Sequence, residues 1–384
     1  MFLPSSSGPP LKIGMIRSSS IGDVVLATSC LHLLEKLHMP VEITWIGRNP
    51  SLELIAKAFP AVRCLPLSEG DQGFDLIDAL KDLHFLVDLQ GNLRSRMLAR
   101  KFKSVWKKPV YTSPRFGMHR RKLVFEARLR GRRSPLPAVS RRAETKQYRT
   151  MANTLQMALE QQLPPELRND LSGFDPFPRF GTIADHPTKP WMKELNFGCW
   201  LAVAAGASYE AKRAPLDVLA KIVSRTRDRY YQIRGNAELP LGLLFLGDQN
   251  DRQTSLKLLD LLGWNDPVLN MAGSLSLWES AQALHGRACL LTNDSSLAHI
   301  AEAVGTPSTV LFGPTVEQFG FAPRMELSRG FSVPLGCRPC SRHGQARCRY
   351  GDQLCFSSLP VEDISGYVVN LLVRKIHKPG GATP

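Results

Sequence analysis

The stretch LLTNDSSLAHIAEAVGTPSTVLFGPT, residues 290–315, indicates the fold class most directly. Apolar runs of strand length occupy residues 288–293 and 308–313, and the residues between them, 294–305, have the spacing of a helix. A strand, a helix and a second strand in this order predict a βαβ unit on a parallel sheet.

The same alternation runs through two long parts of the chain. In the first part, apolar runs at 12–17, 41–47 and 84–90 are each followed by helix-like residues. The alternation begins again near residue 200 and continues through the stretch at 290–315. We therefore predict an α/β protein of two doubly wound, Rossmann-like domains. Ligands are expected outside the carboxyl ends of the strands, in a cleft between the domains.

A segment rich in Pro, Gly and Asp separates the two parts at residues 164–190 and is typical of an interdomain linker. The predicted N-terminal domain is 1–178, and it includes a basic insert at about 111–149. The predicted C-terminal domain is 179–358, and a last helix is expected at 359–378.

The composition of the 384 residues, 43% hydrophobic and 22% charged, is ordinary for a soluble globular protein. Every apolar run is shorter than the roughly 18–20 residues that span a bilayer. The start MFLPSSSGPPLK has neither the basic region nor the apolar region of a signal peptide. We therefore expect a cytoplasmic protein with reduced thiols.

The net charge of +15 is concentrated in one segment. Between Arg94 and Arg149, nineteen Lys and Arg face only Glu126 and Glu144, a local net charge of +17. This concentration predicts an anionic partner, either nucleic acid, an acidic membrane surface or a phosphorylated substrate, although a solvated basic face is the simpler alternative. Few aromatic residues are interleaved and no nucleic-acid motif is present, so nucleic acid is not expected. The amphipathic piece at 119–133 is suited to an anionic membrane surface, with the anchors Leu123, Val124, Phe125 and Leu129.

Small and polar residues follow the strand at 288–293. Asp294 stands where a helix N-cap belongs, Ser295 and Ser296 fall in the first turn, and His299 shares a helix face with Ser296. Alone, Asp294 is a plain cap and His299 a structural histidine. Together with Lys212, which comes after the strand near residue 200 beside a second cation, Arg213, they predict a diphosphate site.

Five blocks in order resemble glycosyltransferase family 9, the bacterial ADP-heptose:lipopolysaccharide heptosyltransferases. The blocks are IRSSSIGDVVLATSCLHLL, VDLQGNLRSRMLAR, GASYEAKRAP, LNMAGSLSLWESAQAL and NDSSLAHIAEAVGTPSTVLFGPT. The resemblance covers about residues 12–373 apart from the basic insert, and Ala214 stands where the family usually has tryptophan. It implies a GT-B fold, in which the acceptor binds the N-terminal domain, the nucleotide sugar binds the C-terminal domain, and the last helix packs back across both.

The resemblance also implies roles for single residues. Lys212, Ser295, Ser296 and His299 would contact the phosphates of ADP-heptose, and Asp294 would hold a hydroxyl or shape the loop. Leu275 falls where an apolar residue lines the adenine site.

The same resemblance makes Asp23 the general base of an inverting transfer. The chain has no D-x-D metal motif, so the charge of the leaving diphosphate would be met by a helix N-terminus and Lys212, without a cofactor. The structural alternative is an N-cap for a helix at 23–38, and both roles can coexist.

The acceptor that the family implies is the inner core of lipopolysaccharide, with its Kdo carboxylates and lipid A phosphates, at the cytoplasmic face of the inner membrane. The residues expected to bind it are Gly22, Arg94, Arg96, Arg120 and Arg121.

Four cysteines, spaced C-x2-C-x7-C-x6-C, occupy a short segment at 337–355: Cys337, Cys340, Cys348 and Cys355. Thiols so close in a reducing compartment suggest a structural metal, zinc or iron, with free thiols or an artificial disulfide as alternatives. The other four cysteines lie in apolar runs and are expected in the core.

Two functional alternatives remain open. One is a family member that uses another nucleotide sugar or a protein acceptor. The other is a non-catalytic protein on the same fold that binds an anionic surface or nucleic acid. The combination of Asp23, Lys212 and His299 favours the enzyme, because a binding protein has no need of all three.

Overall fold

The computed structural model describes residues 8–67, 76–114, 117–132, 146–168, 176–181, 183, 189–195, 198–234 and 239–376. The chain forms two compact units. The first comprises Met1–Phe116 and Thr145–Ile183, and the second comprises Gly117–Glu144 and Ala184–Pro384. The basic insert, which the sequence analysis placed wholly in the N-terminal domain, is therefore grouped for the most part with the second unit.

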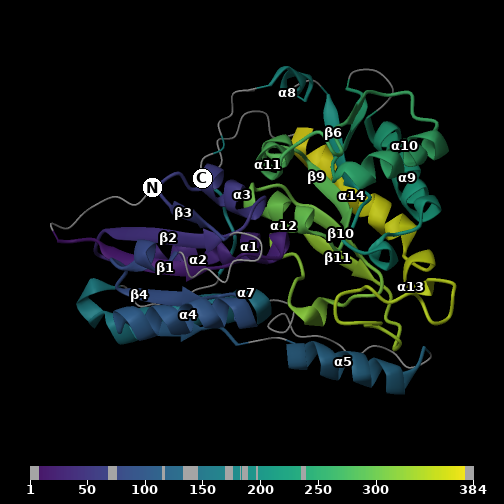
Figure 1. Cartoon of the computed structure of the whole chain (residues 1–384). Helices are drawn as coiled ribbons and strands as arrows, with labels where there is room; N and C mark the ends of the chain where they lie inside the picture. The colour runs from purple at the N-terminus through teal and green to yellow at the C-terminus, as the bar shows by residue number, and fades with distance from the viewer. Residues whose placement is uncertain are drawn as a thin grey trace. The chain divides into compact units, whose positions relative to one another are not determined.

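Among its described residues, the first unit has five parallel strands in the order β3-β2-β1-β4-β5 (Figure 1). The strands are β1 (Leu11–Ile16), β2 (Val41–Gly47), β3 (Arg63–Pro66), β4 (Phe85–Asp88) and β5 (Val110–Thr112). The helices are α1 (Ile21–Ala27), α2 (Ser29–Leu34), α3 (Ser51–Ala58), η2 (Asp78–Leu80), α4 (Leu93–Trp106), α7 (Lys146–Gln162) and η3 (Pro165–Leu167). In the central strand, Ile13 lies opposite Ile43 on one side and Phe85 on the other, and all three are buried. A parallel strand that is buried on both faces can be predicted from a continuous run of apolar residues in the sequence.

In the second unit, the part of the chain that the structure describes forms six parallel strands in the order β11-β10-β9-β6-β7-β8. The strands are β6 (Cys199–Ala204), β7 (Leu241–Phe245), β8 (Val268–Asn270), β9 (Cys289–Asn293), β10 (Ser308–Phe312) and β11 (Arg329–Ser332). The helices are α5 (Gly117–Arg130), α8 (Pro190–Glu194), η4 (Glu210–Lys212), α9 (Leu216–Arg234), α10 (Gln249–Leu262), α11 (Leu277–Leu284), α12 (Ser296–Ala303), η5 (Glu317–Phe319), α13 (Leu354–Ser357) and α14 (Val361–Ile376).

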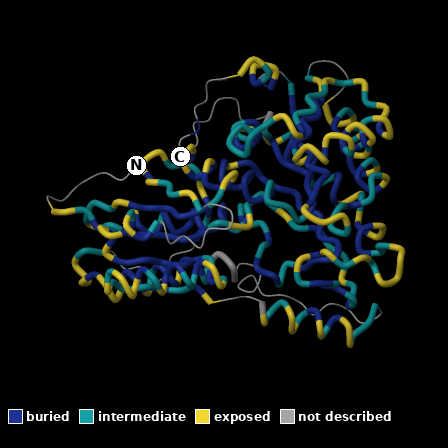
Figure 2. The backbone as a smooth tube through the Cα atoms, in the orientation of Figure 1, coloured by how far each residue is buried: buried dark blue, intermediate teal, exposed yellow. Residues whose placement is uncertain are grey.

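Helices cover both faces of the second sheet. Side chains alternate along β10, so Leu311 packs in one apolar cluster with Val368 of α14, while Val310 and Phe312 pack with Ala298 of α12. Strands β4, β6, β9 and β10 are buried at every position (Figure 2). The predicted α/β class with two doubly wound parallel sheets is confirmed.

The helix predicted at 23–38 is divided into α1 and α2, and Ser20 rather than Asp23 is the N-cap. The division falls at Thr28, whose hydroxyl donates to the Val25 carbonyl at 2.7 Å, while the Ser29 hydroxyl donates to the Leu26 carbonyl at 2.7 Å. Such side-chain bonds compete with helical hydrogen bonds and interrupt the helix.

The last helix, α14, packs on α9 within the second unit, where the side chain of Arg229 pairs with Glu362 and its Nη1 donates to the Glu362 carbonyl. None of the described helices combines the length and apolar character needed to cross a membrane.

Candidate functional site

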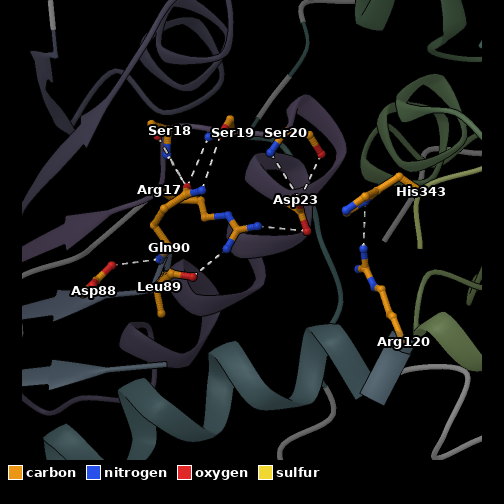
Figure 3. Close-up of polar contacts among 10 residues, drawn as sticks. All are labelled: Arg17, Ser18, Ser19, Ser20, Asp23, Asp88, Leu89, Gln90, Arg120 and His343. Atoms are coloured by element: carbon orange, nitrogen blue, oxygen red, sulfur yellow. Dashed lines mark hydrogen bonds and ion pairs between the residues drawn. The ribbon is translucent and has the colours of Figure 1, made fainter. Parts of the chain in front are cut away.

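Asp23 lies in the first turn of α1, just after the loop that follows β1. Its Oδ2 accepts hydrogen bonds from the backbone N–H of Ser20 at 3.2 Å and from the Ser20 hydroxyl at 2.9 Å. Its Oδ1 forms an ion pair with Nη2 of Arg17 at 2.9 Å (Figure 3). The start of the helix therefore holds one carboxylate oxygen and a guanidinium holds the other.

Arg17, which the sequence analysis did not single out, is only 6% exposed. Besides pairing with Asp23, its Nη1 donates to the Leu89 carbonyl at 2.6 Å, so the guanidinium joins the loop after β1 to the loop after β4 (Figure 3). Removing either charge of this pair would leave the other without its counter-charge and so destabilise the protein. The one signal in the sequence is a cation at the end of a buried strand, six residues before Asp23.

The loop after β4 is organised by Asp88, a fully buried carboxylate. Its Oδ1 accepts from the backbone N–H groups of Gln90 at 3.0 Å and Gly91 at 2.8 Å, and its Oδ2 accepts from the Ser95 hydroxyl at 2.9 Å. Burial raises the pKa of Asp88, although these hydrogen bonds and nearby Arg96 oppose the rise. Gly91 has φ +61°, a conformation that favours glycine. In turn, Oε1 of Gln90 accepts from the backbone N–H of Ser18 at 3.0 Å.

A pocket of the first unit opens at the carboxyl ends of β1, β2 and β4, where ligands bind in doubly wound folds. Its lining residues are Ile16, Ser18, Ser19, Arg48, Leu67, Asn92, Arg94, Ser95 and Leu98. Asn92 caps α4 by accepting from the backbone N–H of Ser95 at 2.9 Å, which places Arg94 in the first turn of that helix. Arg94 was predicted as an acceptor ligand, whereas Arg48 was missed. Two guanidinium side chains beside hydroxyl groups are suited to a carboxylate or phosphate.

In the second unit, Asp294 lies between β9 and α12, one residue before Ser295, which is the N-cap. The predicted cap was therefore one residue too early. Oδ2 of Asp294 pairs with Nζ of Lys212 at 2.8 Å and accepts from the Thr315 hydroxyl at 2.7 Å. Burial alone would raise the pKa of Asp294, but the Lys212 ammonium, the Thr315 hydroxyl and His299 outweigh it and lower the pKa below its ordinary value.

Lys212 ends the short helix η4 and runs past Gly344, a glycine with φ +77°. A Cβ atom at Gly344 would lie 2.4 Å from Cγ of Lys212, so only glycine leaves room for the lysine here. The neighbouring cation, Arg213, pairs with Asp251 at 3.4 Å and donates to the Ala207 carbonyl at 3.2 Å. The structure thus brings Lys212 to Asp294 and uses Arg213 to tie the loop after β6 to α10.

Of the other residues predicted to bind the donor, Ser295, Ser296 and His299 lie at or in α12, and Leu275 lies in the loop before α11. The Ser295 hydroxyl lies 3.0 Å from the Thr292 hydroxyl, and Ser296 begins the helix. His299 is buried, with its ring centroid 6.2 Å from that of Phe321. Leu275 is half-buried, just before α11, whose N-cap Ser276 forms a capping box with Glu279.

Of the predicted acceptor residues, Gly22 lies buried in α1 and Arg96 is half-buried in α4. Arg120 and Arg121 belong instead to α5, in the second unit. The guanidinium of Arg120 lies 4.7 Å from the centre of the Phe321 ring and 3.5 Å from Nδ1 of His343 (Figure 3). Arg121 is exposed.

The four late cysteines, Cys337, Cys340, Cys348 and Cys355, line one pocket. Burial raises the pKa of Cys340 to about 11 and that of Cys355 to about 12. Among the residues that the structure describes, no three His, Cys, Asp or Glu side chains are arranged as metal ligands. The structure therefore lends the predicted metal no support beyond the shared pocket.

The segment that carries the cysteines is anchored by Arg338, which is fully buried. Its guanidinium donates to the carbonyls of Phe312, Gly313, Thr315 and Val333. These bonds connect the cysteine segment to the residues after β10, which include the Thr315 that holds Asp294.

Comparison with known proteins finds a family model that matches part of the second unit. Residues 196–350 match the family described as glycosyltransferase family 9 (heptosyltransferase). No curated protein matches the sequence. Both units superpose on solved structures of low sequence identity, which reflects a shared fold.

The structure of the Escherichia coli ADP-heptose lipopolysaccharide heptosyltransferase II is 16% identical, with a TM-score of 0.62 over 95% of this chain and 100% of that one. The family 9 glycosyltransferase from Veillonella parvula DSM 2008 is 16% identical, with a TM-score of 0.61 over 96% and 100%. The E. coli heptosyltransferase WaaC with ADP is 13% identical, with a TM-score of 0.55 over 94% and 100%. The chain thus resembles glycosyltransferase family 9 over residues 196–350, and both of its units share the GT-B-type fold of the solved heptosyltransferases.

Proposed function

We propose that this enzyme transfers heptose from ADP-heptose to the inner core of lipopolysaccharide, with inversion at the anomeric carbon. The observation that carries the donor side is the ion pair of Lys212 with Asp294 at 2.8 Å, directly before the N-terminus of α12. A helix N-terminus and a lysine are the groups that stabilise a leaving diphosphate. The similar E. coli protein WaaC has been solved with ADP, which supports the choice of an adenine nucleotide.

In the proposed donor site, Lys212, Ser295, Ser296 and His299 contact the diphosphate of the nucleotide sugar. Asp294 shapes the loop or holds a hydroxyl, and Leu275 lies against the adenine. The bond between the anomeric carbon and the phosphate oxygen breaks, and both of its electrons leave with ADP.

On the acceptor side, we propose that Asp23 removes the proton of the attacking hydroxyl as its oxygen forms the new bond to the anomeric carbon. Arg17 and Ser20 hold the carboxylate in one orientation, and such positioning matters because a carboxylate is a weak base. The pocket with Arg48 and Arg94 suits an acidic group of the acceptor. Gly22 and Arg96 are proposed to contribute to the same site, and the acceptor role of Arg120 and Arg121 stays a prediction.

The proposed acceptor would place the enzyme at the cytoplasmic face of the inner membrane. We also retain the proposal that the four late thiols hold a structural zinc or iron ion, because all four line one pocket and four thiolates are a common ligand set for either metal. Metal analysis of protein purified under reducing conditions tests this: about one metal ion per chain supports it, and a metal-free, fully folded chain contradicts it.

The function is tested by a transfer assay that offers ADP-heptose with Kdo-lipid A or with a mono-heptosylated core, in the presence of a chelator. Mass spectrometry should show a product one heptose heavier, and NMR should show an inverted anomeric configuration. Other nucleotide sugars and protein acceptors are offered in parallel. Transfer from one of these alone would replace the proposed donor or acceptor, and the absence of any transfer would favour the non-catalytic alternative.

A further inference from the structure

The helix α5 has apolar side chains on two opposite faces, and only one face is explained by the fold. On the inner face, Val124 and Ala127 are buried, and Val124 packs with Val316 and Phe319 of the second unit. Leu123 and Val124 were both predicted to face a membrane, and the structure corrects this: Val124 is part of the protein core and half-buried Leu123 packs against the same cluster.

Polar contacts hold this inner face in place. The Arg120 guanidinium stacks over the rings of Phe319 and Phe321, at 5.4 and 4.7 Å from their centres. Just after the helix, Arg132 pairs with Asp352 and lies 4.2 Å over the ring of Tyr350. The orientation of α5 on the second unit is therefore defined, and so is the face that points away from it.

The outer face carries a stripe of three large apolar side chains, Met118, Phe125 and Leu129, which are 80%, 62% and 71% exposed. At 3.6 residues per turn, positions 118, 125 and 129 fall within about 40° of one another. Met118 and Leu129 are the two most exposed large apolar side chains in the part of the chain that the structure describes. Figure 2 shows exposed and buried positions alternating along this helix.

Cations flank the stripe on both sides. Arg121 and Arg128 lie along one edge and Lys122 along the other, and all three are exposed. Residues 117–132 contain six Lys or Arg and one acidic residue, Glu126, which pairs with Lys122 at 3.9 Å and Arg130 at 3.6 Å. The outer face is thus apolar along its centre and positively charged at its edges.

We propose that this outer face of α5 docks the enzyme on an anionic phospholipid surface. Met118, Phe125 and Leu129 would enter the boundary between headgroups and acyl chains, while Arg121, Lys122 and Arg128 would meet the lipid phosphates. A nucleic acid would leave the apolar stripe in water, and a second copy of this chain would bring two basic edges together. This proposal rests on the proposed function, because a lipopolysaccharide acceptor would bring the enzyme to a membrane. The docking itself depends only on the side chains of α5.

Binding of the full chain to vesicles tests the proposal. Wild-type protein should sediment with vesicles of phosphatidylglycerol and phosphatidylcholine, less so as salt is raised, and weakly with phosphatidylcholine alone. The variant Met118→Ser/Phe125→Ser/Leu129→Ser should bind at least about tenfold more weakly. The variant Arg121→Gln/Lys122→Gln/Arg128→Gln should lose affinity on the order of a hundredfold, because each cation near an anionic surface contributes about a factor of five.

The matched control is Leu256→Ser/Leu261→Ser on α10, which replaces two side chains that are 42% and 60% exposed away from α5. Its vesicle binding should equal that of the wild type. A direct readout comes from Phe125→Trp, whose added fluorescence should be quenched by brominated phosphatidylglycerol. Equal binding by the stripe variant, binding indifferent to lipid charge, or a dimer that the stripe substitutions dissociate while vesicle binding is absent would each overturn the proposal.

Transfer to a lipid-free core oligosaccharide separates this inference from the proposed function. The stripe variant should retain wild-type turnover with that acceptor. If neither protein transfers heptose, the proposed function fails while the vesicle result still stands on its own.

Discussion

Replacing Asp23 by asparagine (Asp23→Asn) should abolish most of the turnover while leaving a folded protein. The substitution removes the only proton acceptor that we propose for the attacking hydroxyl. General base catalysis by a positioned side chain contributes about 10²–10⁴-fold. We therefore expect kcat to fall at least about a hundredfold, which corresponds to roughly 2.7 kcal/mol of lost transition-state stabilisation.

Asp23→Asn should also lower the free energy of unfolding. The carboxylate accepts from Arg17 at 2.9 Å and from the N–H and hydroxyl of Ser20 at 3.2 and 2.9 Å. The amide of asparagine has only one acceptor oxygen, so it can accept hydrogen bonds either from the Arg17 guanidinium or from the N–H and hydroxyl of Ser20. A hydrogen bond to a charged group contributes about 1.5–3 kcal/mol, and Arg17 keeps its bond to the Leu89 carbonyl. We expect a loss of about 2 kcal/mol, seen as a fall of a few degrees in Tm.

The assay measures ADP release at saturating donor and acceptor, together with calorimetric binding of ADP. Binding of ADP should be unchanged, because the proposed donor residues belong to the second unit. The control Glu53→Gln alters an exposed carboxylate of α3 in the same unit and should leave kcat within about twofold of the wild type. The reasoning is refuted if Asp23→Asn retains near-normal kcat, or if its loss of activity only follows the fraction of unfolded protein.

Three other predictions concern the second unit. Gly344→Ala should weaken ADP binding about tenfold, because the new Cβ would displace Lys212; the control Gly351→Ala, also at a positive φ (+81°) but with open space around it, should leave ADP binding unchanged in calorimetry. Because the folded-state pKa of Asp294 is lowered, its ionised form adds stability above the ordinary aspartate pKa of about 3.9, and the difference in Tm between wild type and Asp294→Asn should shrink as pH falls below about 4. Arg338→Met should cost at least about 3 kcal/mol in unfolding free energy, because four carbonyls lose a buried donor; an unchanged Tm would contradict that.

Much of the fold could be predicted because its strands are parallel and covered on both faces. Strands such as β6 and β9 are buried at every position, so they stand out as unbroken apolar runs. The division of the helix at 23–38 could not be predicted in the same way. Thr28 and Ser29 fit a helical pattern, and the interruption appears only in the structure, where their hydroxyls and the N–H of Thr28 bond to carbonyls three residues earlier.

The position of the small and polar residues before α12 could be predicted because that signal is local, while their proposed roles stay predictions. Contacts that join distant segments could not be predicted. Arg17 and the Leu89 carbonyl are separated by 72 residues, and Arg120 meets His343 across 223 residues. A single sequence shows which side chains lie on one face of an element, but not which segment covers that face. For this reason Leu123 and Val124 of α5 were predicted to be membrane anchors, although they pack against Val316 and Phe319.

Asp23 and Asp294, the two candidate carboxylates, each pair with a cation that follows a central strand of the same sheet. The two pairs differ in a way that suits the proposed roles. Arg17, after β1, has a second anchor in the Leu89 carbonyl, so the charge beside Asp23 is fixed. Among the contacts in the described structure, the ammonium of Lys212, after β6, pairs with Asp294. A diphosphate that binds at α12 must therefore share this lysine with Asp294 or draw it away. Because Asp294 continues to attract Lys212, the binding of ADP releases less free energy than it would with an unpaired lysine. ADP, the product, is then bound less tightly and leaves more readily.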